Sequence, residues 1–168
     1  ASAPLPDAAA RQRAANAEQT VAIIGASGFL GKKLDRTFRD AGFHVIGTSF
    51  SKPGFERLDV TDEPTVQAFL ERTKPNVVVY AAAEVYPANT PEGTARAQAL
   101  NADAVATIAK HFKGHFVYVS TDAVFQRGQG PYGPDTPADA TKTYGRTKRQ
   151  GEELALHTPA FERATVLR

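Results

Sequence analysis

Residues 20–34 read TVAIIGASGFLGKKL, and this stretch decides the fold. A β-branched run over residues 21–24 stops at Gly25, and apolar residues then recur at helical spacing from Leu30 onward. The pattern predicts a strand, a tight glycine turn and a helix. Because backbone amides at a helix N-terminus favour anions, such a turn can hold the pyrophosphate of a dinucleotide.

Three glycines at three-residue intervals form the predicted turn. We expect Gly25 to permit the sharp turn, because glycine adopts backbone conformations that other residues avoid. Gly28 would let phosphate groups approach the backbone, and Gly31 would let the helix pack close to the strand. Three further residues of the turn complete the expected dinucleotide site: Ser27, Phe29 and Leu30.

The composition fits one folded domain. The chain has 168 residues, of which 42% are hydrophobic and 23% are charged, and this length can bury a sizeable core. A net charge of +2, without a basic stripe among aromatic residues, argues against a nucleic-acid partner. No apolar run is long enough to span a membrane.

Cysteine is absent, and the histidines have no metal-like spacing. Without cysteine the chain has no disulfide, catalytic thiol or cysteine-based metal site. We predict that the protein holds no metal and that its histidines are structural or on the surface: His44, His111, His115 and His157.

Residues 1–19 precede the first predicted strand and are rich in alanine. Three alternatives stay open for them: a flexible tail or linker, a short helix over residues 8–17, or the remnant of an organelle-targeting peptide. We therefore divide the chain into this tail and a dinucleotide-binding domain over residues 20–168. A cytoplasmic location is expected, with a mitochondrial one as the alternative.

Strands and helices alternate along the rest of the chain. After the first unit, strands are predicted over residues 43–46, 55–60, 77–80, 115–119 and 163–168. Helices are predicted to begin near residue 62 and to cover residues 95–110 and 141–156. This alternation predicts an α/β fold, a Rossmann-type doubly wound parallel β-sheet flanked by helices.

The end of the second predicted strand bears on the choice of cofactor. In NAD-binding folds an acidic residue usually binds the ribose hydroxyls at this point, but here the sequence continues GTSFSK over residues 47–52. The hydroxyl of Ser49 and the amine of Lys52 suit a ribose 2′-phosphate. We therefore predict NADP(H), with NAD(H) as the alternative if Lys52 is only a solvated loop residue.

Tyr144 and Lys148 lie four residues apart in a predicted helix, so they share one face. A free tyrosine has a pKa of about 10, which is too high for easy proton transfer at neutral pH. A nearby ammonium group stabilises the phenolate, so we expect Lys148 to lower the pKa of Tyr144. The strand predicted upstream ends in Ser120, Thr121 and Asp122.

The glycine turn, the Ser-Thr-Asp run and the Tyr-x-x-x-Lys pair have the order and spacing of the extended short-chain dehydrogenase/reductase family, which this chain resembles over residues 20–168. STDAVF over residues 120–125 and YGRTKRQGE over residues 144–152 resemble two of its members in particular. These are the dTDP-4-dehydrorhamnose reductases and the regulatory β-subunit of methionine adenosyltransferase.

The resemblance implies a role for each residue of the Tyr-Lys region. Tyr144 would donate a proton to a carbonyl oxygen while hydride arrives from the nicotinamide. Thr121, or alternatively Ser120, would hydrogen-bond the same oxygen, and Lys148 would hold the nicotinamide ribose. Tyr144 and Lys148 thus count as both catalytic and cofactor-binding residues.

The same resemblance implies contacts with the rest of the cofactor. Asp59 and Val60 would lie at the adenine ring, and Asn101 would support the active site. Small side chains at the end of a buried strand leave room for a cofactor, and in the family they line its ribose: Ala81, Ala82 and Ala83.

The chain also departs from the family. Ala140 and Lys142 stand where the family usually has proline and asparagine, which puts the substrate loop in doubt. Members of the family continue past the strand predicted at residues 163–168 into a part that completes the substrate pocket. We therefore expect this chain to be part of a longer protein or a reduced version of one.

Two functions remain open at this stage. The first is an NADP(H)-dependent reductase of a keto group in a nucleotide-sugar-like substrate. The second is a non-catalytic NADP(H)-binding regulatory or scaffold subunit, which would bind a partner enzyme or form part of a larger complex. A homodimer or a subunit of a complex is expected in either case.

Overall fold

The computed structural model describes residues 7–125 and 130–168. Its six strands form one sheet in the order β3-β2-β1-β4-β5-β6, and every neighbouring pair is parallel. The predicted fold class is therefore confirmed. The strand bounds are β1 Thr20–Ile24, β2 His44–Ser49, β3 Glu56–Arg57, β4 Val77–Tyr80, β5 His115–Val119 and β6 Arg163–Leu167.

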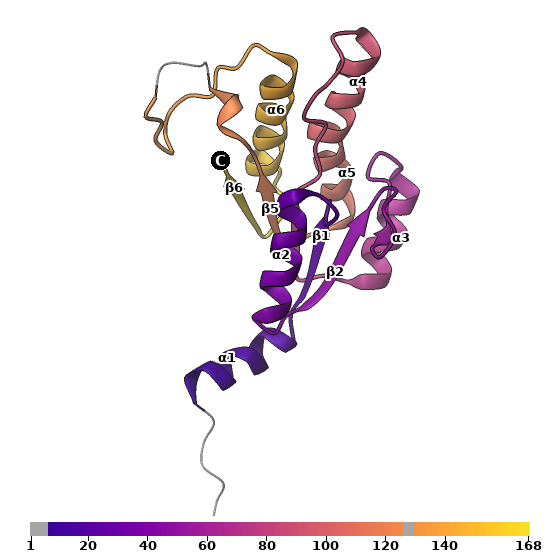
Figure 1. The fold of residues 1–168 in the computed structure, drawn as a ribbon, viewed down its shortest axis with the longest axis vertical. Helices are drawn as coiled ribbons and strands as arrows, with labels where there is room; N and C mark the ends of the chain where they lie inside the picture. The colour runs from indigo at the N-terminus through magenta and orange to yellow at the C-terminus, as the bar shows by residue number, and fades with distance from the viewer. Residues whose placement is uncertain (1–6, 126–129) are drawn as a thin grey trace, which may run out of the picture.

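Helices cover both faces of the sheet (Figure 1). The α2 helix packs on β1 and β2, whereas α3, α5 and α6 pack side by side on the opposite face. A π-helical turn, η1, joins α4 to α5, and a 3₁₀ turn, η2, follows β5. The bounds are α1 Ala8–Ala17, α2 Phe29–Asp40, α3 Glu63–Thr73, α4 Pro91–Gln98, η1 Ala99–Asp103, α5 Ala104–His111, η2 Asp122–Val124 and α6 Thr143–His157.

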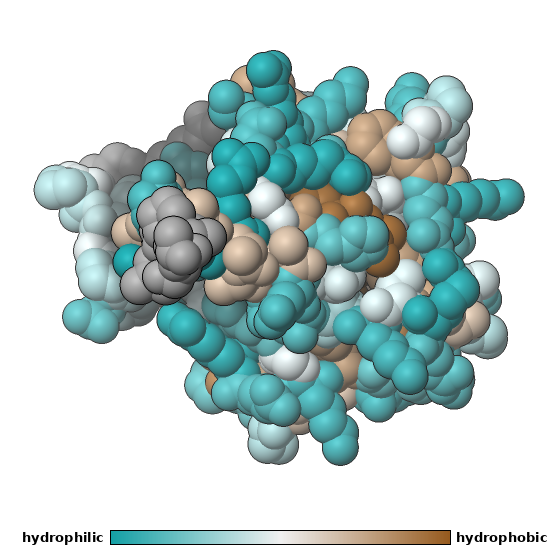
Figure 2. Space-filling model, turned by 90° about the horizontal axis from the view of Figure 1, so that it is seen from below, coloured by the Kyte–Doolittle hydropathy of each residue, from teal (hydrophilic) through white to brown (hydrophobic). Residues whose placement is uncertain are grey.

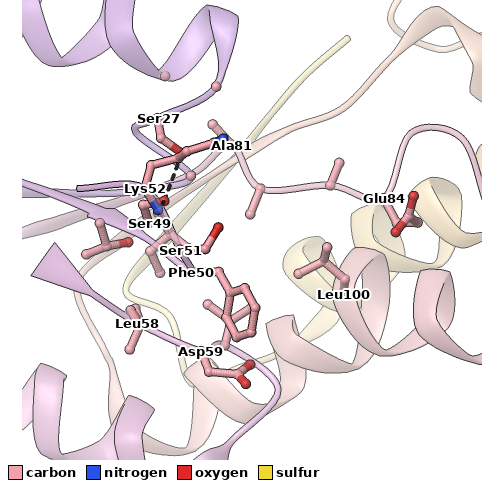
Figure 3. Close-up of a pocket in the computed structure, with 18 of the residues that line it drawn as sticks. Ser27, Ser49, Phe50, Ser51, Lys52, Leu58, Asp59, Ala81, Glu84 and Leu100 are labelled. Carbon is pink, nitrogen blue, oxygen red and sulfur yellow. Dashed lines mark hydrogen bonds between the residues drawn. The ribbon is translucent and has the colours of Figure 1, made fainter. Parts of the chain in front are cut away.

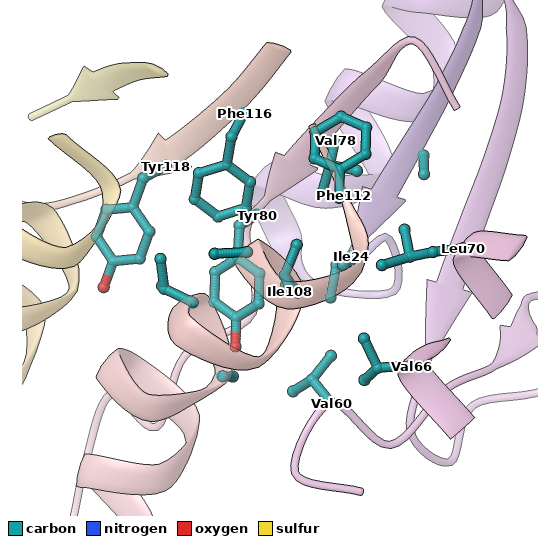
Figure 4. Packing of buried hydrophobic residues seen from close by; sticks show 14 of the residues in the cluster. Ile24, Val60, Val66, Leu70, Val78, Tyr80, Ile108, Phe112, Phe116 and Tyr118 are labelled. Atoms are coloured by element: carbon teal, nitrogen blue, oxygen red, sulfur yellow. The ribbon is translucent and has the colours of Figure 1, made fainter. Parts of the chain in front are cut away.

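Alternate residues of the central strands enter two separate hydrophobic clusters. Ile24, Val78 and Tyr80 face α3 and α5 in the larger cluster (Figure 4), while Val21 and Val79 face α2 in the smaller one. A slip of one residue in the pairing would exchange the two sets, so burial on both faces specifies the register of the sheet.

The second and third strands differ in length from their predictions. Strand β2 extends through Thr48 and Ser49, which read as a loop in the sequence, because both pair with β3 and are buried. Backbone pairing here outweighs the turn preference of these residue types. Strand β3 has only two residues, because Asp59 forms a turn in which its Oδ1 accepts the backbone N–H of Thr61 at 2.9 Å.

The helix predicted over residues 95–110 begins earlier and is not uniform. It starts at α4, where Thr90 caps the first turn and Pro91 stands at the first helical position, both good start signals. The spacing of apolar residues did not predict the first part of α4, because the exposed face of this helix is polar. The π-helical turn η1 interrupts the helix at Asn101, and helix α6 begins two residues later than predicted.

The structure has a helix over Ala8–Ala17, one of the alternatives that the sequence left open, while residues 1–6 lie outside the described residues. Asp7 caps α1 by accepting the backbone N–H of Ala10, and Asn16 Nδ2 donates to the carbonyl oxygen of Ala41 at 2.8 Å.

Most of the face seen from the α1 end is hydrophilic, with one hydrophobic area exposed (Figure 2). No helix in the described ranges is long and apolar enough to cross a membrane.

Candidate functional site

A cavity of about 700 Å³ lies at the carboxyl ends of β1, β2 and β4. Strand order reverses at β1, and open α/β sheets bind their ligands at such a switch point. The cavity brings together every residue predicted to bind the cofactor except Asn101, Tyr144 and Lys148. These residues are Gly25, Ser27, Gly28, Phe29, Leu30, Gly31, Ser49, Lys52, Asp59, Val60, Ala81, Ala82 and Ala83.

Sequence reasoning missed part of the lining. Some of these residues adjoin predicted ones and could have been found by extending each strand end. Arg96 and Leu100 could not, because only the packing of α4 and η1 brings them to the cavity. The missed residues are Ile24, Thr48, Phe50, Ser51, Leu58, Thr61, Glu84, Val85, Arg96 and Leu100.

The glycine turn has the geometry that its sequence predicts. Gly25 has a φ of 87°, and a Cβ atom there would lie 2.6 Å from the backbone nitrogen of Ala82. A Cβ atom on Gly31 would collide with the carbonyl oxygen of Gly25. Gly28 is the N-cap of α2 and offers no side-chain cap, so no cap from this residue occupies the first amides of the helix.

Hydroxyl groups and an amine gather at the end of β2 (Figure 3). The Oγ atoms of Ser27 and Ser49 are hydrogen-bonded at 2.9 Å, and Ser49 Oγ also accepts the backbone N–H of Lys52 at 3.0 Å. This cluster can offer hydroxyls and a cation to an anionic group. Glu84 and Leu100 lie at the opposite end of the view.

Two residues that were predicted to contact the cofactor form hydrogen bonds with other residues of the protein. Asp59 Oδ1 accepts the N–H and the Oγ1 hydroxyl of Thr61 at 2.9 and 2.6 Å, so this oxygen serves the turn after β3. Asn101 is fully buried and does not line the cavity. Its Oδ1 accepts the Glu84 N–H at 2.8 Å, and its Nδ2 donates to Glu84 O at 3.1 Å and Thr147 Oγ1 at 3.0 Å.

Asn101 therefore ties the loop after β4 to α6 rather than facing the cavity. Two tyrosines of the sheet form hydrogen bonds with the turn that carries Asn101. Tyr80 donates its hydroxyl to Leu100 O, and Tyr118 donates to Asn101 O, each at 2.6 Å. A π-helical turn disturbs the regular helical ladder, and these hydroxyls bond two carbonyls of the turn. Burial raises the pKa of both tyrosines, which keeps them as donors.

Tyr144 and Thr121 meet at the carboxyl end of β5. The pKa of Tyr144 is raised, chiefly by burial, with Asp122 and Tyr86 adding to the rise, and the Thr121 hydroxyl opposes it. That hydroxyl donates to Asp122 Oδ1 at 3.3 Å and accepts the backbone N–H of Ala123 at 3.1 Å. Ser120, the alternative to Thr121, has a buried hydroxyl oxygen without a hydrogen-bond partner in the described ranges.

Lys148 does not lower the pKa of Tyr144 in this structure, so that expectation is wrong here. Its Nζ donates to the carbonyl oxygen of Val119 at 2.6 Å and lies 4.1 Å from the ring centroid of Tyr118. The ammonium group is thus held against β5. Burial lowers the pKa of Lys148 to about 8, although the charge of Glu152 raises it.

The three predicted catalytic residues do not line the 700 Å³ cavity. They stand at the ends of β5 and on α6, the next strand and helix along the sheet from β4. No cluster of three or more histidine or acidic residues that could hold a metal ion occurs within residues 7–125 and 130–168.

A parallel sheet, a glycine turn between β1 and α2, and a cavity at the switch point define a Rossmann-type domain. Over residues 19–168 the sequence matches the family described as the RmlD substrate binding domain. The chain belongs to this family, which confirms the resemblance found in the sequence.

Two curated relatives illustrate the family's range. Methionine adenosyltransferase 2 subunit beta of Xenopus tropicalis is 36% identical over 151 residues, 87% of this chain and 45% of the relative. A probable dTDP-4,6-dihydroxy-2-methyloxan-3-one 4-ketoreductase of Streptomyces antibioticus is also 36% identical over 151 residues, 87% of this chain and 49% of the relative. The chain thus spans about half the length of the curated relatives it matches.

A solved structure shares the fold. It is dTDP-4-dehydrorhamnose reductase from Bacillus anthracis in complex with NADP, which aligns with a TM-score of 0.74 and 24% identity. The alignment covers 88% of this chain and 52% of that one. At this identity the likeness shows the architecture alone.

Proposed function

We propose that this chain forms the dinucleotide-binding part of an NADP(H)-dependent reductase, which acts on a keto group of a nucleotide-linked sugar or a similar compound. The observation that carries the proposal is that Thr121 and Tyr144 lie close enough at the end of β5 for Thr121 to oppose the rise in the pKa of Tyr144. The neighbouring strand, β4, ends at the 700 Å³ cavity. Two neighbouring hydroxyls can orient and protonate a carbonyl oxygen.

The residues present fit a nicotinamide dinucleotide. The cavity has the size of a cofactor site, and α2 approaches the turn so closely that a Cβ atom on Gly31 would collide with the carbonyl oxygen of Gly25. When bound, NADPH would supply hydride to the carbonyl carbon. Tyr144 would then give its phenolic proton to the carbonyl oxygen, Thr121 would orient that oxygen, and Lys148 would hold the nicotinamide ribose.

The choice of NADP(H) over NAD(H) rests on the end of β2. Ser27, Ser49 and Lys52 converge there, and together they suit a ribose 2′-phosphate better than free ribose hydroxyls. Fluorescence titration with NADPH and with NADH tests this choice. We expect NADPH to bind more tightly; equal or tighter NADH binding would contradict it.

Replacement of Tyr144 with phenylalanine tests the reductase itself. Loss of the proton donor should lower turnover by about 10²–10⁴-fold, while NADPH affinity stays within about twofold because the cavity does not include this side chain. Leu156→Ala, on the same helix, is the control, since Leu156 is 51% exposed. Unchanged turnover in Tyr144→Phe would overturn the proposed role.

A second function is favoured by a specific observation. In the structure Lys148 contacts β5 instead of lowering the pKa of Tyr144, and one relative at 36% identity is named as a subunit beta. These points favour an NADP(H)-binding regulatory or scaffold subunit that binds a partner enzyme. If Tyr144→Phe leaves every function of the assembly intact while NADPH still binds, this second function is supported.

A further inference from the structure

Glu152 and Lys148 occupy positions on α6 at which oppositely charged side chains usually pair. They are four residues apart, and only 2% and 1% of their surfaces are exposed. Yet both carboxylate oxygens of Glu152 bind Arg168 instead. Arg168 Nε donates to Oε1 at 3.0 Å, and its Nη2 donates to Oε2 at 2.7 Å.

Arg168 is held on a second side as well. Its guanidinium carbon lies 5.1 Å from the ring centroid of Phe125, and Phe125 stacks on Tyr132 at 4.3 Å. Phe125 directly follows η2, which begins next to Thr121. Arg168 therefore connects α6 to the segment that begins at Thr121.

The planar guanidinium suits this position better than an ammonium group would. It binds a carboxylate in two parallel hydrogen bonds and stacks on an aromatic ring at the same time. A buried carboxylate without a partner would draw the nearest cation, because an uncompensated buried charge is costly. Without Arg168, that cation would be Lys148.

We propose that Arg168 is a positioning residue for Lys148: it occupies both oxygens of Glu152 and so leaves the ammonium group against Val119 and Tyr118, on the face of α6 that carries Tyr144. The relevance of this position to reduction rests on the proposed function. The location of the Lys148 ammonium group does not depend on that function, and it can be tested without cofactor or substrate.

The charged and titratable groups around Lys148 come from several elements. Tyr118 of β5 lies under the ammonium group, Glu152 stands on α6 itself, and Arg168 comes from the end of β6. Nearby, Asp122 of η2 raises the pKa of Tyr144. Among them, Glu152 is the acidic group that acts on the pKa of Lys148, raising it against the effect of burial.

The test is a pH titration of the Lys148 side chain, followed by the ¹³Cε resonance in protein labelled at lysine. Arg168→Gln should raise the pKa of Lys148 by about one unit or more, because Glu152 then has no other cation. Arg163→Gln, at the exposed start of β6, the strand that Arg168 directly follows, is the matched control and should leave this pKa unchanged. A folded Arg168→Gln variant without a shift would overturn the proposal.

A double variant separates the charge from packing. Arg168→Gln combined with Glu152→Gln removes both charges, so the pKa of Lys148 should return below that of the single Arg168 variant. If the raised value persists in the double variant, lost packing and not Glu152 is responsible, and the proposal is wrong. Should Arg168→Gln not fold, Glu152→Gln alone still decides: it should lower this pKa, and an unchanged value would overturn the proposal.

Activity is the separate readout for the proposed function. If the protein reduces a carbonyl substrate with NADPH, the alkaline limb of its pH profile should move in the same direction as the NMR titration in Arg168→Gln. A shift seen by NMR in a protein without reductase activity supports the positioning role and counts against the proposed function alone.

Discussion

Two regions of the molecule are built in different ways. One is the glycine-turn cavity, and the other is the region around Tyr144 at the carboxyl ends of β5 and β6, which we call the Tyr144 edge. The cavity is lined by short consecutive runs of residues that follow β1, β2 and β4. At its glycine turn, the groups offered to a ligand are mainly backbone atoms. At the Tyr144 edge, single side chains of η1, of α6 and of Arg168 after β6 find their partners on other elements. A site of the first kind can be predicted from local sequence, whereas one of the second kind depends on how whole elements pack.

The largest effect is expected in the cavity, from Gly25→Ala. The added Cβ would lie 2.6 Å from a backbone nitrogen, at a φ of 87°. We expect loss of NADPH binding and a fall of roughly 3 kcal/mol or more in the free energy of unfolding. Urea denaturation and NADPH titration measure the two effects.

Gly54→Ala is the matched control for that substitution. Gly54 has a similar φ of 83°, but nothing lies within 4 Å of its Cβ position. It should lose only about 1 kcal/mol, from backbone strain alone. Equal losses in the two variants would show that the close contact with Ala82 does not matter.

The pH dependence of stability probes the Tyr144 edge. The pKa of Lys148 is lowered by burial from 10.5 to about 8, so between these values the unfolded chain binds more protons than the folded one. The free energy of unfolding should therefore rise with pH from about 8 to about 10.5, by about 3 kcal/mol from this group. Lys148→Met should lack this rise, and urea denaturation at a series of pH values compares the two proteins.

Asn101→Ala tests the connection between the two regions. It removes the partner of the Glu84 N–H and carbonyl groups and of Thr147. Buried polar groups left without partners should cost about 2 kcal/mol of unfolding free energy, and NADPH affinity should fall because Glu84 follows the alanines of the cavity. Asn89→Ala, which is exposed, should change neither quantity.

The smallest effect is expected from Lys52→Ala. If the end of β2 receives a 2′-phosphate, loss of this cation should weaken NADPH binding by roughly tenfold. NADH binding should not change, since NADH lacks that phosphate. Lys33→Ala, exposed on α2, is the control, and an equal loss for NADH and NADPH would contradict the cofactor choice.

The comparison also explains which sequence predictions hold in the structure. The fold class, the six strands and the glycine turn are confirmed, because hydrophobic runs and glycine spacing act over a few residues. Errors occur where tertiary contacts override local preference. Thr48 and Ser49 are strand residues because β3 pairs with them, and α4 is helical although its surface is polar.

The sequence by itself determined the parallel sheet, the glycine turn and the placement of Tyr144 and Lys148 four residues apart on one helix. Each depends on spacing along the chain. Only the tertiary structure decided where the buried polar groups find their partners. Asn101 bonds Thr147 across 46 residues, and Lys148 bonds Val119 across 29. A buried polar group must be satisfied wherever packing leaves a partner, and sequence spacing does not specify that place.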